Sequence, residues 1–329
     1  MENSATKGRI KRQNNQLYYL AGIWRTDLLP RWAKRLKRRL CLRGWEKRPD
    51  ADYIRDRVEY YCRVRPGSQT LQQDIPGQHA YRVGDFSRRG MGSHYYYDMG
   101  RYVKSFDASL RMACFTCDIF FNPEGPNLMK GRRLDSLRDN CALLNLDSRR
   151  HFMKVYDPIP FADKKPVLFF RGAITGKPHR VAFFERWASH PLFDLGDTAH
   201  DCVSPWGTPS VSIPDHFNYQ FILCLEGNDF ASALQWVMAS NCVPVMTRPT
   251  VEGWLMHGRL QPGVHYIEIA DDYSDAADKL TWYTSHPEEA ARIAAESKRW
   301  AEQFNDRRRE NIISYLVVER FLKAVNSGE

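Results

Sequence analysis

The sequence predicts an α/β fold, and the prediction rests on one stretch in which strand and helix patterns alternate. Residues 221–225 form a short apolar run typical of a buried strand, and residues 243–246 form a second one. Between them the polar turn Glu226-Gly-Asn-Asp229 precedes residues 230–240, whose apolar side chains recur at helical spacing. The order strand, turn, helix, strand is the repeating unit of a parallel α/β sheet.

The turn at residues 226–229 has the composition of a ligand-binding loop. Ligands of open α/β sheets bind outside the carboxyl ends of the strands, where loops meet helix N-termini. Gly227 lets the backbone approach a ligand, and the free N–H groups at the start of the next helix favour an anion. Asn228 or Asp229 can cap that helix, while Glu226 directs its carboxylate into the same crevice. A nucleotide sugar fits this chemistry, and a structural turn with a capped helix is the alternative.

The length and composition are those of a folded protein with room for two domains. The chain has 329 residues, of which 43% are hydrophobic and 13% aromatic, so a disordered protein is excluded. No run approaches the roughly 18 apolar residues of a membrane span. Eight cysteines without a preceding signal peptide fit a reduced, cytoplasmic chain. Cys114-Phe-Thr-Cys117 lacks the second pair that a zinc site of this type needs.

The positive charge is concentrated at the start of the chain. Residues 1–50 hold 14 Lys/Arg and 4 Asp/Glu, a net +10, so the total of +9 leaves −1 for all other residues. Leu29 and Leu40 bound a helical apolar stripe that is flanked by basic side chains. Such a helix suits an anionic membrane surface, the protein's own body or nucleic acid. The residues assigned to a membrane or acceptor surface are Trp32, Arg35, Arg38 and Arg39.

The rest of the chain predicts further elements around this unit. Residues 1–24 are polar and basic, a composition typical of partial disorder. Pro158, Pro160 and Pro166 mark the best candidate for a domain boundary. Asp271-Asp272 precedes a helical pattern and is interpreted as helix-start capping instead of a metal site. We expect helices at 95–106, 135–154, 181–187, 250–256, 287–304 and 309–325, and strands at 111–121, 167–170 and 263–269.

A second anion-binding loop is predicted after the strand at residues 167–170. Gly172-Ala-Ile-Thr-Gly-Lys-Pro178 has three residues between its glycines and Pro where a magnesium-binding Ser or Thr belongs, which excludes a Walker motif. Arg171 and Arg180 flank this loop, and both are candidates to lie near a phosphate. Asp118 interrupts the predicted strand at 111–121, and a structural ion pair with Arg132 or Arg133 is the alternative to a chemical role.

Several ordered blocks resemble glycosyltransferase family 90, which includes protein O-glucosyltransferases, capsule xylosyltransferases and bacterial lipopolysaccharide core glycosyltransferases. The likeness spans about residues 95–305 and is closest to the lipopolysaccharide branch. The blocks are Leu168-Phe-Phe-Arg-Gly172, Glu226-Gly-Asn-Asp-Phe-Ala-Ser232, Gln235-Trp-Val-Met-Ala-Ser-Asn241, Glu252-Gly-Trp-Leu-Met256, Pro262-Gly-Val-His-Tyr266 and Asp271-Asp-Tyr-Ser274.

This resemblance implies a GT-B fold, in which two Rossmann-like domains face a cleft and the C-terminal one holds the donor. The implied division is a basic N-terminal extension at 1–50, an acceptor-side domain at 51–162, a nucleotide-sugar domain at 163–305 and a C-terminal helix at 306–329. By position, Asp118 lies where the eukaryotic members of the family carry their catalytic aspartate. The implied donor-binding residues are Arg171, Gly172, Thr175, Arg180, Glu226, Gly227, Asn228, Asp229, Phe230, Ala231, Ser232 and Glu252.

The resemblance also implies the reaction. Family members invert the anomeric centre without a metal or other cofactor, so Asp118 would act as general base while arginines and the turn stabilise the leaving nucleotide diphosphate. The chain departs from eukaryotic members at Ala233-Leu-Gln235, where they carry a phosphate-binding arginine, and Arg171, Arg180 or Arg248 is expected to replace it. We expect a UDP-sugar donor, a lipopolysaccharide core acceptor and a peripheral location at the inner face of the bacterial inner membrane. A non-catalytic sugar-nucleotide-binding relative and a nucleic-acid-binding protein are the alternatives, and the near-neutral body argues against the second.

Overall fold

The chain forms an α/β structure, as expected, with two compact units. The computed structural model describes residues 8–11, 14–70, 75–118, 121–134, 140–148, 150–199 and 204–327. Unit 1 comprises residues 1–12, 151–249 and 258–303, and unit 2 comprises residues 13–150, 250–257 and 304–329. Most of the basic N-terminal segment and the last helix therefore group with unit 2, and each unit is described separately below.

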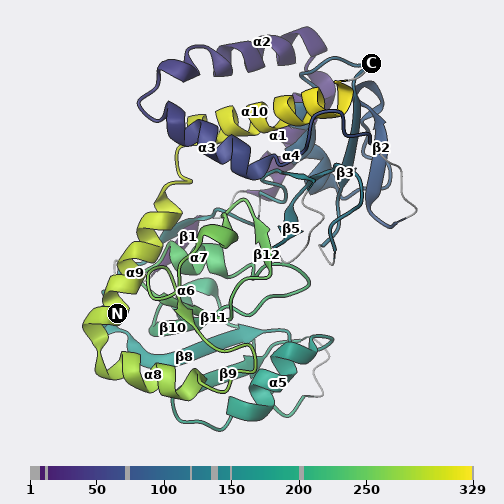
Figure 1. Ribbon diagram of the computed structural model, residues 1–329. Helices are drawn as coiled ribbons and strands as arrows, with labels where there is room; N and C mark the ends of the chain where they lie inside the picture. The colour runs from purple at the N-terminus through teal and green to yellow at the C-terminus, as the bar shows by residue number, and fades with distance from the viewer. Residues whose placement is uncertain are drawn as a thin grey trace. The chain divides into compact units, whose positions relative to one another are not determined.

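Unit 1 is built on a five-stranded sheet in which every neighbouring pair is parallel (Figure 1). The strand order is β13-β11-β10-β8-β9. This architecture confirms the α/β prediction made from the central stretch. The strands are β8 (Lys165–Gly172), β9 (Phe193–Asp197), β10 (Tyr219–Leu223), β11 (Val243–Met246) and β13 (Ile267–Glu268), and a separate antiparallel pair joins β1 (Arg9–Lys11) to β7 (Lys154–Tyr156).

Helices cover both faces of this sheet. Side chains alternate along each strand, so neighbouring apolar residues point to opposite faces and both faces need to be covered. Phe170 and Phe221 point to one face, where they join a buried cluster that includes Phe183 of α5 (Pro178–Trp187) and Leu280 of α8 (Ala276–Ser285). Phe169 points to the other face, where its ring lies 5.0 Å from His216 of α6 (Ile213–His216). The remaining unit-1 helices are α7 (Leu234–Met238) and α9 (Pro287–Glu302).

The strand order places a topological switch point at β8. From β8 the chain passes through α5 to β9 on one side, and β10 then pairs with β8 on the other side. The loops that follow β8 and β10 therefore diverge at the carboxyl edge of the sheet, where open α/β sheets bind ligands. Both predicted anion loops follow these two strands.

In its described residues, unit 2 combines a four-stranded mixed sheet with five helices and a π-helical segment, Trp24–Leu28. The sheet order is β2-β3-β4-β6, with β3, β4 and β6 parallel and β2 antiparallel to β3. The described elements are α1 (Asn15–Ile23), α2 (Arg31–Leu42), α3 (Ala51–Tyr61), α4 (Ser93–Val103), α10 (Arg307–Asn326), β2 (Gln78–Arg82), β3 (Arg111–Phe115), β4 (Leu128–Met129), β6 (Ala142–Leu143), and the pair β5 (Gly131–Arg133) and β12 (Val251–Gly253).

Short 3-10 turns join several of these elements. They are Trp45–Lys47, Val83–Asp85, Phe161–Asp163 and His257–Arg259. Among the described residues, no helix combines the length and the apolar character needed to traverse a bilayer.

Several secondary-structure predictions differ from the structure, and the strands expected at 111–121 and 263–269 are shortened to β3 and β13. The described part of residues 135–154 contains β6 and the first residue of β7 instead of a helix, and residues 250–256 contain β12 instead of a helix. In both places pairing with a distant strand outweighs local preference. The first 24 residues were predicted to be partly disordered, and their described part contains β1 and α1. The helix expected at 230–240 is limited to Leu234–Met238.

Candidate functional site

Arg180 joins the two predicted anion loops at the carboxyl edge of the unit-1 sheet. Its Nε donates to the carbonyl oxygen of Glu226 at 2.9 Å, and its terminal nitrogens donate to the carbonyls of Leu225 at 2.8 Å and Ala173 at 2.9 Å. One guanidinium therefore binds the loop after β8 and the turn after β10. The structure thus brings together Gly172, Arg180 and the Glu226–Gly227 turn, and it assigns Arg180 a bracing role.

The side chains around Arg180 fix the same two loops. His179 Nε2 lies 2.8 Å from the Glu226 carbonyl oxygen, so this carbonyl has two partners. Asp197, which is fully buried at the end of β9, accepts the backbone N–H of Ile174 at 3.3 Å. The sequence analysis missed both residues. Pro178 was an available signal, because Pro at the first position of a helix fixes where α5 begins and therefore directs residues 179 and 180 back toward the preceding loop.

The Gly227 turn differs from its predicted form. Gly227 N–H donates to the carbonyl of Asp229 at 2.8 Å, and α7 begins only at Leu234, with Ala233 at the N-cap position. The prediction that Asn228 or Asp229 caps this helix is therefore wrong. A Cβ atom on Gly227 would meet Arg180 Nη2 at 3.5 Å, an ordinary contact distance, so the turn leaves room beside this residue.

The other donor-binding residues predicted in these loops fall into an inner and an outer group. Phe230 and Ala231 are buried, and the Phe230 ring lies 5.4 Å from the ring of His151. These two residues therefore anchor the turn. Thr175, Asn228 and Ser232 are exposed, whereas Glu226 and Asp229 are half-buried. The exposed polar groups are the ones that a ligand at this edge meets without displacing protein.

Arg171 lies on the face of the sheet opposite to Arg180. Its guanidinium carbon is 4.3 Å from the centre of the Phe169 ring, whereas that of Arg180 is 5.7 Å from the Phe170 ring, and these neighbouring phenylalanines point to opposite faces. Arg171 forms an ion pair with Asp194 at 2.6 Å. The structure therefore does not bring Arg171 together with the Gly227 turn.

Two other cations lie at the loop edge. Arg248 follows β11 and is largely exposed, and it pairs with Glu268 at 3.2 Å. Lys177 is the N-cap residue of α5, directly after the loop that Arg180 holds. Ion pairs between exposed side chains are weak and exchange readily with other partners. Of the three arginines expected to replace the missing one, Arg248 is the most available to a ligand.

Asp118 lies at the carboxyl edge of the unit-2 sheet. It follows β3 and forms an ion pair at 3.0 Å with Lys130, which directly follows the adjacent parallel strand β4. Lys130 is buried, whereas more than a third of the Asp118 side chain is exposed. The structural partner of Asp118 is thus Lys130, and the proposed alternative partner Arg132 instead contacts Glu252. Burial raises the pKa of the neighbouring Tyr95 phenol, and Lys130 opposes that rise.

A buried carboxylate network lies next to this pair. Asp98 of α4 accepts hydrogen bonds from the Tyr18 hydroxyl at 2.9 Å and from the Ser148 N–H at 2.7 Å. Burial raises the pKa of Asp98 to about 6, and its hydrogen bonds only partly oppose this shift. Asp147, also buried, has a positive φ of 58° and pairs with Arg150 at 3.1 Å. These groups fix the position of the loop that follows β6.

Glu252, which was expected to contact the donor, lies in unit 2 with no exposed surface. It forms an ion pair at 2.6 Å with the equally buried Arg132, a second one with Arg63 at 3.5 Å and a hydrogen bond with Tyr60. Because its carboxylate is occupied by these partners, we leave Glu252 out of the donor site. Its role in the structure is to hold β12 against β5.

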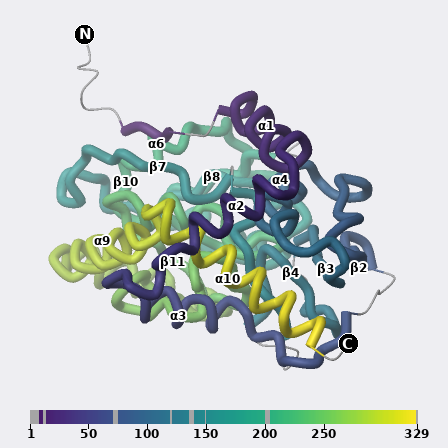
Figure 2. The backbone as a smooth tube through the Cα atoms, turned by 90° about the horizontal axis from the view of Figure 1, so that it is seen from above, coloured from purple at the N-terminus to yellow at the C-terminus, as the bar shows by residue number. Residues whose placement is uncertain are grey.

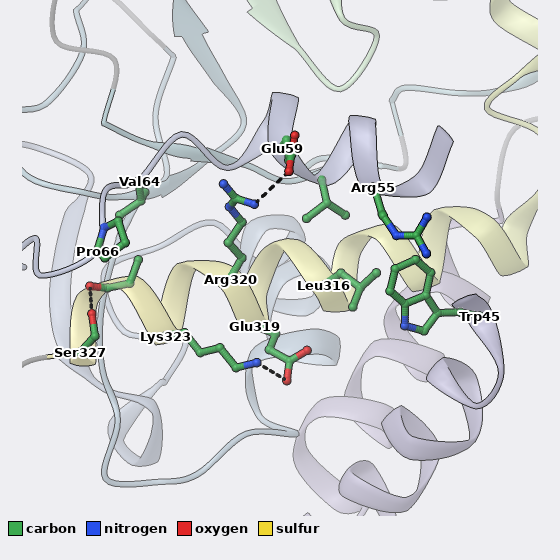
Figure 3. A pocket seen from close by; sticks show the side chains of 12 residues that line it. Trp45, Arg55, Glu59, Val64, Pro66, Leu316, Glu319, Arg320, Lys323 and Ser327 are labelled. Atoms are coloured by element: carbon green, nitrogen blue, oxygen red, sulfur yellow. Dashed lines mark hydrogen bonds and ion pairs between the residues drawn. The ribbon is translucent and has the colours of Figure 1, made fainter. Parts of the chain in front are cut away.

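A groove of about 510 Å³ lies elsewhere in unit 2, between α3 and α10 (Figure 3). Its floor is apolar, and its rim carries both signs of charge, including an ion pair between Arg320 and Glu59. None of the residues predicted for the donor or the catalytic step lines this groove. The predicted surface residues Trp32, Arg35 and Arg39 are exposed on α2, and Arg38 packs over Phe106.

Comparison with known proteins identifies the family. The sequence profile described as "Glycosyl transferase family 90" matches residues 146–318, just over half of the chain. The chain is 35% identical over 269 residues to "O-glucosyltransferase LpsA" of Dichelobacter nodosus, which covers 82% of each protein. It is 33% identical over 91 residues to "Protein O-glucosyltransferase 2" of Danio rerio. This match covers 28% of this chain and 18% of that relative. The chain therefore belongs to glycosyltransferase family 90 and is a glycosyltransferase.

Proposed function

We propose that this enzyme transfers a sugar, with inversion, from a nucleotide-diphosphate donor to a hydroxyl group of a lipopolysaccharide core or a related cell-surface glycan. The observation that carries the proposal is the joining of two loops by Arg180 at the switch point of a parallel sheet. This is the edge at which open α/β folds bind nucleotides. A UDP-sugar is the donor we infer, and the glucosyl activity in the printed name of the Dichelobacter relative makes UDP-glucose the first candidate.

The donor diphosphate would lie against the loop after β8 and the Gly227 turn. Arg180 keeps these loops in place. Its Nε and both terminal nitrogens already donate to carbonyl groups, which leaves it fewer N–H groups for a phosphate. Lys177 and Arg248 would then supply the positive charge that neutralises the phosphates. A leaving diphosphate gains most from charges that are already in position when the bond to the sugar breaks.

Asp118 is the residue we propose as general base. Its carboxylate would take the proton of the acceptor hydroxyl as that oxygen attacks C1 of the sugar. The bond between C1 and the diphosphate oxygen breaks in the same step, and the nucleotide diphosphate leaves with the bonding electron pair. Lys130, at 3.0 Å, holds the carboxylate in one orientation. We propose no metal or other cofactor for this step, because arginine and lysine side chains can carry out the charge neutralisation.

Thermal-shift measurements with nucleotide sugars test the donor site. We expect UDP-glucose or a related UDP-sugar at saturating concentration to raise the melting temperature by about 3 °C or more. Lys177→Ala and Arg248→Ala should each reduce that shift, whereas Lys279→Ala, which removes an exposed lysine on α8, should not. No shift with any nucleotide sugar, or equal shifts in all variants, would refute the proposed donor site.

Turnover tests the transfer step separately from donor binding, which matters because Ala233 and Gln235 occupy the region where eukaryotic members carry a phosphate-binding arginine. Donor binding alone gives a thermal shift but releases no UDP from a labelled UDP-sugar. We expect release of UDP that depends on a glycan acceptor, and its absence would contradict the proposed transfer.

A further inference from the structure

The N-terminal helices of unit 2 pack with their apolar sides facing outward. Figure 2 shows α1 and α2 in the purple part of the chain, and Pro30 is the N-cap residue of α2. The sequence left open whether the apolar stripe of this region docks on the protein's own body. The structure excludes that arrangement for α2, since Trp32 is 69% exposed, Leu36 48% and Leu40 57%.

The charged side of α2 forms the contacts with unit 2 instead. Lys34 is buried and donates to the Thr26 carbonyl at 2.7 Å, and burial lowers the pKa of its ammonium group. Arg38 stacks over the Phe106 ring at 3.9 Å, and Arg31 lies 3.4 Å from the Gly84 carbonyl. Lys34 and Arg38 are one turn apart, on the side of the helix opposite to Leu36. Cationic side chains therefore fix α2 in place while its apolar ridge faces solvent.

α1 and the π-helix have the same arrangement. Tyr18, Gly22 and Thr26 are buried, and they approach α4 closely enough that a Cβ atom at Gly22 would lie 2.6 Å from the Tyr97 ring. The opposite side exposes large apolar residues. They are Leu17, Leu20, Ile23, Trp24 and Leu28. Eight large apolar side chains between residues 17 and 40 are thus exposed on one segment, which is far more than scattered surface hydrophobics.

The charges beside this ridge are mostly positive, although Arg35 pairs with the exposed Asp107 at 3.4 Å. Residues 15–43 contain eight Lys/Arg and one Asp, a net +7. Arg35 and Arg39 flank the ridge of α2 on one side and Lys37 on the other, and all three are exposed. Near the end of α2, a hollow of about 490 Å³ is lined by Arg38, Arg39, Leu40, Leu42, Arg43 and Glu319. Long basic side chains beside an apolar ridge reach the headgroup level while the ridge inserts.

We propose that the α1–α2 segment is a membrane-docking surface. It inserts its apolar ridge into the headgroup region of the facing leaflet of an anionic phospholipid bilayer. A partner that matches this segment must combine apolar surface with an excess of negative charge. An anionic bilayer matches both features, because it offers an apolar interior under a negatively charged surface. Trp24 and Trp32 have the side chain that favours this interface. The inference is independent of the proposed sugar transfer, since vesicle binding needs neither donor nor acceptor.

Flotation with phospholipid vesicles tests this surface in the full chain. We expect the wild-type chain to float with vesicles of phosphatidylglycerol and phosphatidylcholine and to remain unbound with phosphatidylcholine alone. Trp32→Ser combined with Leu36→Ser should lower the partition coefficient about tenfold or more, because it removes inserted apolar area. Arg35→Gln combined with Arg39→Gln should lower it about fivefold for each charge removed, with a strong dependence on salt.

Matched substitutions elsewhere in the chain separate docking from general effects. Trp282→Ser removes a half-exposed tryptophan on α8, and Arg292→Gln with Arg299→Gln removes two exposed charges from α9. Both should bind vesicles as the wild type does, and circular dichroism should show every variant to be folded. Unchanged vesicle binding by the Trp32/Leu36 variant would overturn the proposal. A second outcome would also overturn it: the wild type forms a dimer and binds no vesicles, and the Trp32/Leu36 variant is a monomer. The ridge would then be an interface between copies of the chain.

Discussion

The carboxyl edges of the two parallel-strand regions are held together in different ways. In unit 1, Arg180 braces the loops after β8 and β10 by donating to backbone carbonyls. In unit 2, the edge that carries Asp118 is held by side chains that pair with one another, among them Lys130 with Asp118 and Tyr18 with Asp98. The first edge is therefore held mainly through backbone atoms, with His179 and Asp197 acting beside Arg180, and the second depends on pairs between side chains.

This difference predicts that the two edges respond differently to substitution. Backbone carbonyls stay in place when an exposed loop side chain changes, so we expect the unit-1 edge to tolerate substitutions except at Arg180, His179 and Asp197. A buried ion pair leaves an uncompensated charge when one partner is removed, and this costs more than the net worth of the pair. The predictions below separate the two kinds of edge, beginning with the largest expected effect.

Asp118→Asn should have the largest effect on turnover. If Asp118 is the general base, its removal lowers kcat by about 100- to 10,000-fold, because proton transfer from the acceptor hydroxyl is lost. Donor binding, measured by the thermal shift with a UDP-sugar, should stay close to that of the wild type. Asp52→Asn, on an almost fully exposed carboxylate of α3, is the control and should retain activity. Near wild-type turnover in Asp118→Asn would assign the base to another residue.

Glu252→Gln tests the ionic network of unit 2. We expect the free energy of unfolding in urea to fall by about 3 to 5 kcal/mol, because Arg132 is then left buried without its partner carboxylate. The affinity for the nucleotide sugar in the surviving folded protein should not change. A stable variant with much weaker donor binding would return Glu252 to the donor site.

Arg180→Met tests the brace of unit 1. Three carbonyl groups lose a charged donor, which should lower the free energy of unfolding by about 2 to 4 kcal/mol and weaken donor binding at the same time. Arg186→Met, an exposed arginine on the same helix, should change neither quantity. If Arg180→Met weakened donor binding with no loss of stability, Arg180 would contact the phosphate directly.

Asp98 gives unit 2 a pH-dependent stability. Its folded-state pKa of about 6 exceeds the ordinary value of 3.8, so the folded state binds this proton more tightly than the unfolded state. The stabilisation is complete below the ordinary pKa and is lost as the pH rises through about 6, with a total of about 3 kcal/mol. Urea unfolding of the wild type and Asp98→Asn between these pH values should show a stability difference that changes with this sign. A difference that stays constant would mean that Asp98 is ionised throughout.

The elements that could be predicted from the sequence are those whose signals are local. The strand at 243–246 was predicted at the residues where β11 is found, and the helix at 287–304 closely matches α9 (Pro287–Glu302). Residues 250–256 were assigned wrongly because β12 forms only through pairing with β5, more than a hundred positions away. The helix α2 was predicted as an amphipathic helix, but no sequence period indicates that its cationic side faces the protein.

In the candidate site, too, the features with local sequence signals could be predicted and those that depend on distant contacts could not. The loops at 172–178 and 226–232 have local signals, namely glycines after apolar strands, and the structure joins them. The bracing by His179 and Asp197 and the pairing of Asp118 with Lys130 depend on contacts between segments, which one sequence does not contain. The positions of Arg171 and Glu252 could not be predicted either, because each depends on a distant partner.

Hydrogen–deuterium exchange with and without UDP tests most directly the claim that the two braced loops bind the nucleotide diphosphate. We predict slower amide exchange in residues 172–181 and 224–234 when UDP is bound, and no change in the segment around Glu252. Arg180→Met should abolish this protection, and Arg186→Met should keep it. Protection by UDP that is confined to other parts of the chain, with these two loops unchanged, would contradict the account.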